Sequence, residues 1–245
     1  MKKLLSLPVA APPRVLNRLR AAQDLGLVGR AMSVVHHGEH ALYLELDGWC
    51  LGVVDEQASA LPNALRMRTS DYRALNVTSA HLGQGGIVIG GAQLVIGRLC
   101  RVDAPALSDA ALVGAHDFPA HFPRLEAMHV GGLVGHGEGL TPTGDDILCG
   151  WLAVHRAFGI ETPEVDAAIR RRLADTTLLS SSLLDCALHG EVVPTFGAYL
   201  ESLGTPQEPE RARAVAEIGH TTGHALLQGA RWALRDLSSA RVSAA

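Results

Sequence analysis

Residues Gly135 to Gly150 read GHGEGLTPTGDDILCG, and one of the expected helices begins within them. A glycine-rich, hydroxyl-bearing turn runs into Asp145 and Asp146, and the apolar stretch Ile147 to Phe158 follows at once. The pattern predicts Thr143 as N-cap and both carboxylates in the first turn, where they suit the exposed N–H groups and the helix dipole. A capped helix after a flexible loop is the simpler interpretation. We favour a functional site, because the stretch holds more glycine, hydroxyl, imidazole and carboxylate groups than a cap requires.

The same pattern occurs a second time near the C-terminus. The segment Thr143–Gly150, TGDDILCG, aligns with Thr222–Gly229, TGHALLQG, and each continues into an apolar helix that contains a tryptophan. The structural interpretation is a pair of helices that cross at Gly150 and Gly229. The functional interpretation adds that both helix N-termini face one pocket, with carboxylates from one helix and imidazole from the other. The two interpretations are compatible.

Composition limits the classes of function. The chain has 245 residues, 47% of them hydrophobic and 19% charged, which is typical of an ordered globular protein. A net charge of −4 and the lack of a basic stripe argue against nucleic-acid binding. The four cysteines form no C-x-x-C pair, which suits a reducing cytoplasm. No apolar run is long enough to cross a bilayer, and residues 1–13 are interpreted as a plain N-terminal arm rather than a signal peptide.

The two halves of the chain differ in periodicity, which predicts an α+β fold. A helix is expected over residues 14–25, and the chain to Cys100 has short alternating or β-branched runs, with a hairpin at Gly90 and Gly91. Beyond Pro105 helices are expected over residues 107–115, 120–134, 145–158, 164–175, 178–189, 195–203, 209–218 and 223–236. We expect a single domain over residues 1–245, β-rich over about 26–103 and helical over about 105–238.

The candidate site residues lie in and around the two repeated segments. The candidate catalytic residues are Asp145, Asp146, His220 and His224. The candidate substrate-binding residues offer hydroxyl groups or accessible backbone N–H groups: Gly137, Gly139, Thr141, Thr143, Gly144, Ser181, Thr221, Thr222 and Gly223. Asp145 and Asp146 are candidate ligands for Mg²⁺ or Mn²⁺. His220 and His224 with one aspartate would form a two-His, one-carboxylate site, but Gly219 and Gly223 interrupt the helix that this needs.

A hydroxyl cluster, Ser180 to Ser182, stands at an expected helix start. It either caps that helix or folds over the glycine turn to bind an anion, and the sequence leaves both interpretations open.

These motifs together resemble the AllH-like bacterial family. The pattern G-x-G-x-G-L-T-P-[ST]-G-D-D-x-L-x-G lies at Gly135–Gly150, T-x-x-x-S leading to L-x-x-A-x-x-G lies at Thr177–Gly190, and G-H-[ST]-[ST]-G opens Gly219–Gly229. That family includes a subunit assigned to oxamate carbamoyltransferase in allantoin breakdown. The resemblance implies a small anionic substrate, partner subunits, and phosphorolysis of oxalurate to oxamate and carbamoyl phosphate, or the reverse. Two alternatives remain: a stand-alone metal-assisted hydrolase or lyase of a small carboxylated amide, and a non-catalytic anion-binding regulatory subunit.

Overall fold

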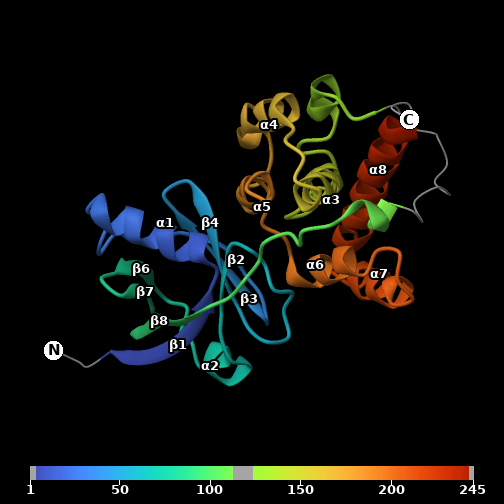
Figure 1. Ribbon diagram of the computed structural model, residues 1–245. Helices are drawn as coiled ribbons and strands as arrows, with labels where there is room; N and C mark the ends of the chain where they lie inside the picture. The colour runs from blue at the N-terminus through green and yellow to red at the C-terminus, as the bar shows by residue number, and fades with distance from the viewer. Residues whose placement is uncertain (1–3, 113–123, 243–245) are drawn as a thin grey trace. The chain divides into compact units, whose positions relative to one another are not determined.

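A computed structural model describes residues 4–112 and 124–242, and the chain divides into two compact units, Met1–Arg101 and Val102–Ala245 (Figure 1). The first unit holds an eight-stranded sheet and the second is helical, which confirms the α+β class. The boundary agrees with the change of periodicity near Cys100. That the two units act as a single domain stays a prediction.

The sheet of the N-terminal unit is mixed, with the strand order β2-β3-β4-β5-β1-β8-β7-β6. The strands are β1 (Leu5–Ala11), β2 (Val34–His37), β3 (Ala41–Leu46), β4 (Trp49–Val54), β5 (Ala64–Arg66), β6 (Ala80–Gly83), β7 (Gly86–Ile89) and β8 (Ala92–Leu99). Strand β1 pairs in parallel with β8, β4 pairs in parallel with β5, and the remaining pairs are antiparallel. Helix α1 (Pro13–Asp24) and the short helix α2 (Thr69–Arg73) complete the unit.

The expectation of a plain N-terminal arm is wrong, because residues 5–11 form strand β1 in the middle of the sheet. Val9 and Ala11 are buried there, 3% and 0% exposed. Pro8 concealed the strand, since a proline within an apolar run argues against a central strand. The expected helix over residues 14–25 is confirmed by α1, and the Gly90–Gly91 hairpin joins β7 to β8 with both glycines at positive φ.

The helical unit follows the predicted periodicity closely. Its helices are α3 (Thr143–Ala157), α4 (Pro163–Arg170), α5 (Leu178–Leu188), α6 (Pro194–Glu201), α7 (Glu208–Ala216) and α8 (Thr222–Val242). In the described residues of the first two expected helices, the structure has the 3₁₀ turns η1 (Asp109–Leu112) and η3 (Ala127–Gly132); residues 113–123 lie outside the described residues. Another 3₁₀ turn, η4 (Leu173–Asp175), precedes α5.

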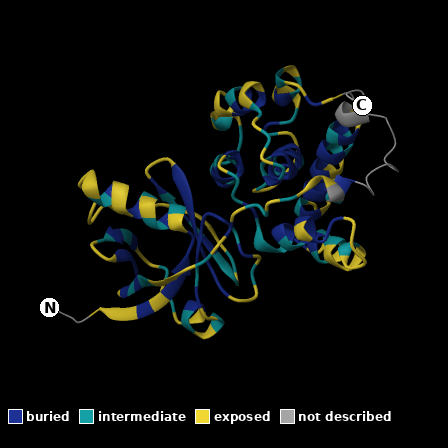
Figure 2. Ribbon diagram, viewed as in Figure 1, coloured by how far each residue is buried: buried dark blue, intermediate teal, exposed yellow. Residues whose placement is uncertain are grey.

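Helices α3 and α8 form the centre of the unit and cross at the two repeated glycines. A Cβ atom on Gly150 would stand 2.1 Å from the carbonyl oxygen of Leu226, and one on Gly229 would stand 2.0 Å from that of Ile147. Ile147 and Leu226 hold equivalent places in the repeat, so the contact is reciprocal. The predicted crossing is confirmed, and Figure 2 shows both helices buried along much of their length.

No helix in residues 4–112 or 124–242 has both the length and the apolar character needed to cross a membrane.

Candidate functional site

The site begins where the glycine turn enters α3. The helix starts at Thr143 with Pro142 in the N-cap position, so the prediction of Thr143 as N-cap is wrong. The carbonyl oxygen of Pro142 accepts from the backbone N–H groups of Asp145 and Asp146, at 3.0 and 3.2 Å. Both carboxylates therefore lie in the first turn of the helix, as predicted.

Two of the glycines around the turn are required by the packing of the chain on itself. A Cβ atom on Gly135 would stand 2.4 Å from the carbonyl oxygen of Asp175, and one on Gly144 would stand 2.0 Å from that of Leu133. Gly137 similarly lies against the backbone of Thr143, whereas Gly139 is exposed with open space beside it. Close self-packing, which the sequence does not distinguish from close ligand approach, accounts for most of these glycines.

Asp145 is fully buried and joins three segments of the chain. Its Oδ1 atom accepts from the backbone N–H of Gly135 at 2.9 Å. Its Oδ2 atom accepts from the hydroxyl groups of Thr176 and Ser180, the latter at 2.7 Å. Charge-assisted bonds of this kind are about twice as strong as neutral ones. Asp145 thus ties the glycine turn and the start of α5 to α3.

Asp146 is also buried, at 3% exposure, but its hydrogen bonding differs from that of Asp145. Its Oδ2 atom has no hydrogen-bond partner among the described residues. Burial raises the pKa of its carboxyl to about 7, and the charge of Asp145 acts in the same direction. The hydroxyl groups of Thr222 and Thr141 oppose this rise in pKa. Near neutral pH this carboxyl exchanges a proton readily, which is the property of a general acid or base.

The N-termini of α3 and α8 lie side by side, as predicted. The hydroxyl groups of Thr141 and Thr222 are 2.9 Å apart and share a hydrogen bond, and both residues are half-buried. Thr221 is exposed just before α8, and Gly223 is buried against the carbonyl oxygen of Val215. That the two N-termini face one cavity stays a prediction.

The two candidate histidines stand at the surface of the same end of α8. His220 precedes the helix and His224 lies in its first turn, and both are exposed. Within the described part of the chain, neither imidazole makes a hydrogen bond or an ion pair with another residue, so neither contacts the carboxylate of Asp145 or Asp146. Both histidines remain accessible to a ligand.

The two aspartates offer a divalent cation few free oxygen atoms. The two oxygens of Asp145 already accept three hydrogen bonds, and Asp146 presents one oxygen without a partner among the described residues. No three His, Cys, Asp or Glu side chains gather as a metal centre in residues 4–112 and 124–242. Mg²⁺ is usually bound by one or two carboxylates together with water and substrate oxygens. That Asp145 and Asp146 hold Mg²⁺ or Mn²⁺ stays a prediction.

The cap of α5 comes from Thr177, just before the Ser180–Ser182 cluster, and its side chain accepts from the backbone N–H of Ser180. The Ser180 hydroxyl donates to Asp145, which ties the cluster to the first turn of α3. Ser181 is half-buried beside it. That the cluster binds an anion stays a prediction. The contact of Thr176 with Asp145 was not predicted from the sequence.

Part of the chain matches a known protein family. Residues 133–234 match the model of the oxamate carbamoyltransferase subunit AllH. The match begins just before the glycine turn, includes the Asp145 contacts and the start of α8, and does not reach the N-terminal unit. No curated protein and no solved structure matches the chain. The family match supports an AllH-like family for this chain, carried by its helical unit.

Proposed function

We propose that this chain is a catalytic subunit of an oxamate carbamoyltransferase, in which the adjoining N-termini of α3 and α8 bind the substrate and catalyse transfer of its carbamoyl group. The match of residues 133–234 to the AllH family model supports a subunit of that enzyme. The observation that carries the catalytic proposal is Asp146, a buried carboxyl with a pKa of about 7 and one unpartnered oxygen. A group in this state is adapted to move a proton at neutral pH.

The reaction requires one proton to be supplied and one to be removed. In the direction of phosphorolysis, an oxygen of hydrogen phosphate bonds to the carbamoyl carbon of oxalurate. The bond from that carbon to the oxamate nitrogen breaks, and the nitrogen takes a proton. Neutral Asp146 supplies this proton, and its carboxylate then accepts the proton that the phosphate loses. The starting state is restored, and the products are oxamate and carbamoyl phosphate.

The surrounding residues have distinct parts in this proposal. The paired hydroxyls of Thr141 and Thr222 stand beside Asp146 and pass its proton toward the surface. His220 and His224, exposed at the start of α8, provide N–H donors for the substrate anion. Asp145 acts as a positioning residue, because all its contacts hold the turn and α5 in place.

The test reconstitutes the chain with the products of its neighbouring genes and measures phosphate-dependent formation of carbamoyl phosphate from oxalurate. Three preparations are compared, each with and without a chelator: the isolated chain, the complete set, and the set without this chain. We expect turnover only in the complete set. In that set Asp146→Asn should lower kcat by about a hundredfold, the lower end of what a general acid or base contributes. Glu164→Gln, at an exposed carboxylate of α4, is the matched control and should leave kcat unchanged.

Other outcomes would redirect the assignment. Full activity in the set without this chain would overturn the proposal. Normal activity of the Asp146→Asn set would leave a non-catalytic anion-binding subunit. Turnover of another small amide by the isolated chain would favour the hydrolase or lyase, and loss of activity with chelator would support the metal hypothesis.

A further inference from the structure

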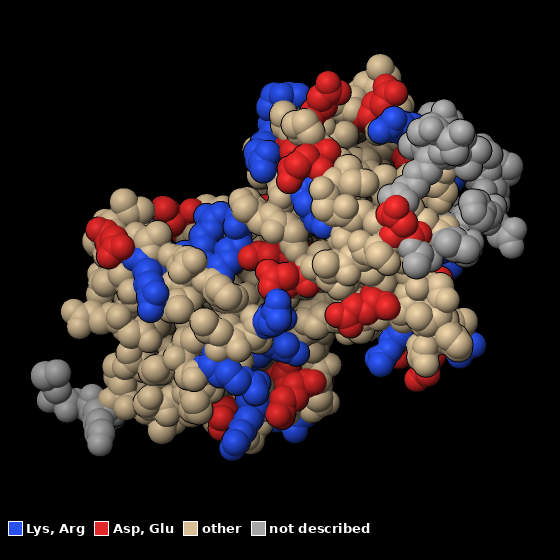
Figure 3. Space-filling model, in the orientation of Figure 1, with Lys and Arg blue, Asp and Glu red and all other residues tan. Residues whose placement is uncertain are grey.

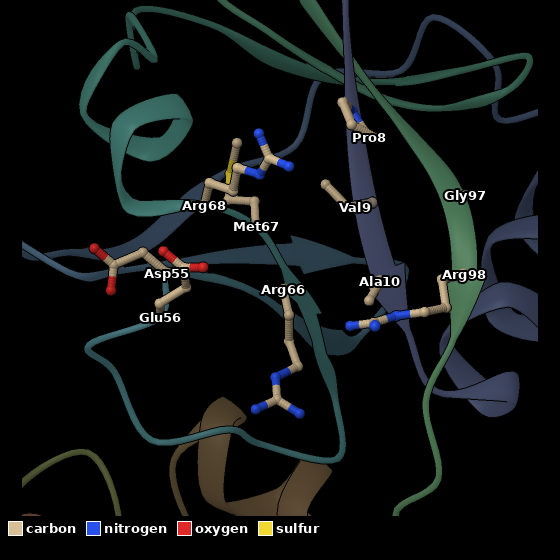
Figure 4. A pocket seen from close by; sticks show the side chains of 10 residues that line it. All are labelled: Pro8, Val9, Ala10, Asp55, Glu56, Arg66, Met67, Arg68, Gly97 and Arg98. Carbon is tan, nitrogen blue, oxygen red and sulfur yellow. The ribbon is translucent and has the colours of Figure 1, made fainter.

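A hollow of about 530 Å³ lies on the sheet of the N-terminal unit. Its lining comes from β1, from the end of β8, and from the segments that follow β4 and include β5 (Figure 4). The volume falls within the range of roughly 300–1,000 Å³ that is usual for small-molecule sites. Three arginines, Arg66, Arg68 and Arg98, stand around it, and basic side chains are prominent on the visible face of this unit (Figure 3).

The register of the sheet places two of these arginines in one row. Ala10 of β1 pairs with Arg66 of β5 on one side and with Arg98 of β8 on the other. Paired residues of neighbouring strands project from the same face, and two strand spacings separate their Cα atoms by roughly 10 Å. The methyl side chain of Ala10 leaves the space between them open. Figure 4 shows Arg98 extending over Ala10 into the hollow.

A β-bulge brings Arg98 to this face. In the pairing of β1 with β8, Val9 is opposite Ile96, but Ala10 is opposite Arg98, so Gly97 is the extra residue. In an uninterrupted register Ala10 would pair with Gly97, and the side chain of Arg98 would turn to the other face. Bulges of this kind re-aim side chains and are common beside functional sites.

The acidic residues of the hollow are already engaged. Asp55 accepts from the backbone N–H groups of Gln57 and Ala58 and is paired with His40 at 3.0 Å. The Glu56 carboxylate accepts from the backbone N–H of Thr69. Within residues 4–112 and 124–242, the side chains of Arg66, Arg68 and Arg98 form no hydrogen bond or ion pair. Three arginines and two carboxylates therefore line the hollow, so its positive charge exceeds its negative charge. An anion is favoured at the side where Arg66 and Arg98 flank Ala10.

We propose that this hollow binds a small molecule through an oxyanion group, a phosphate or a carboxylate, held between Arg66 and Arg98. The planar guanidinium group donates in pairs to both kinds of oxyanion. Arg68 lies two residues beyond Arg66 along extended backbone and adds a third cation at the rim. The site belongs to the N-terminal unit, which the family match does not reach, and it does not depend on the catalytic proposal for Asp146.

The experiment titrates the full chain by calorimetry at low ionic strength with inorganic phosphate and, separately, with malonate. The variants are Arg66→Gln and Arg98→Gln, with Arg20→Gln as the control. Arg20 is an exposed arginine of α1 in the same unit, so its change alters the net charge equally. We expect saturable one-site binding of one probe, weakened about tenfold by each hollow variant, as the loss of a charge-assisted hydrogen bond predicts. Arg20→Gln should bind as the unmodified chain does.

Each outcome decides the matter. Tighter binding of phosphate supports the proposal with a phosphate ligand, and tighter binding of malonate supports it with a carboxylate ligand. The absence of saturable binding of either probe would overturn it. An equal loss of affinity in Arg20→Gln would also overturn it, because binding would then follow net charge. Circular dichroism of each variant shows whether the fold is retained.

Discussion

The N-terminal turns of α3 and α8 share a sequence pattern and a packing role but differ in chemistry. Each supplies the glycine that accepts the backbone of the other helix, Gly150 against Leu226 and Gly229 against Ile147. At the intervening positions α3 has Asp145 and Asp146, whereas α8 has His224 and Ala225. The repeated glycines therefore determine how the two helices cross. The residues that differ determine which functional groups lie at the helix N-termini.

The two adjacent aspartates of α3, Asp145 and Asp146, also differ from each other in their surroundings. Asp145 accepts from three donors, which come from the glycine turn and the start of α5, while Asp146 has an oxygen without a partner among the described residues. Their different surroundings give one a positioning role and make the other a group that titrates near neutral pH.

The largest expected effect is at the crossing itself. Gly150→Ala and Gly229→Ala each place a methyl group about 2 Å from a backbone carbonyl oxygen, so the helices must separate. Although alanine favours a helix by about 1 kcal/mol over glycine, we expect a net loss of at least about 3 kcal/mol in the free energy of unfolding. Denaturation followed by circular dichroism measures it. Gly132→Ala, where no atom lies within 4 Å of the added methyl group, is the control. Equal stability of all three variants would contradict the close crossing.

The next effect distinguishes the aspartates. In Asp145→Asn an amide nitrogen would face donor groups, leaving at least one of them unsatisfied in the interior. We expect a loss of about 2–3 kcal/mol in the free energy of unfolding. Asp175→Asn, which removes an exposed ion pair with Arg172, should cost less than about 1 kcal/mol. If both substitutions cost the same, Asp145 does not brace the turn.

The sequence predicted the helical unit better than the sheet, for physical reasons. Long amphipathic helices such as α3 and α8 repeat their pattern over several turns, so their periodicity is unambiguous. Strand β1 was missed because Pro8 interrupts its apolar run, and β5 because it has three residues. The two-helix part of the site was predictable from the repeated glycines. The different roles of Asp145 and Asp146 were not predictable from the sequence. They depend on Thr176 and Ser180, which are brought to Asp145 only by tertiary packing.

An effect whose size depends on pH is expected at Asp146. The pKa of its carboxyl rises from 3.8 to about 7 on folding, so the folded chain holds the proton more tightly than the unfolded chain. This contribution to stability is full below pH 3.8 and is lost as the pH rises toward about 7. The shift corresponds to a few kcal/mol at most.

Asp146→Asn removes this titration. Relative to the unmodified chain, the variant should gain stability between about pH 4 and 7 and keep the gain at pH 8. Urea denaturation of both proteins at pH 4, 6 and 8 tests the prediction. A stability difference that stays constant over this range would mean that Asp146 is not the titrating group.

The smallest expected effect on folding is at His224, which occupies the place of Asp145 in the second repeat. Its side chain is exposed and has no hydrogen-bond partner among the described residues, so His224→Ala should change the free energy of unfolding by less than about 0.5 kcal/mol. In the reconstituted enzyme the same variant should raise KM for the anionic substrate with less change in kcat, because the imidazole would contribute binding rather than proton transfer. His189→Ala, at the exposed C-cap of α5, is the histidine control for KM only, because the His189 imidazole contacts Asp185 and so contributes to folding. An unchanged KM in His224→Ala would mean that only α3 contributes side chains to substrate binding and catalysis. A large loss of stability would instead show that His224, like Asp145 in the first repeat, has a structural role.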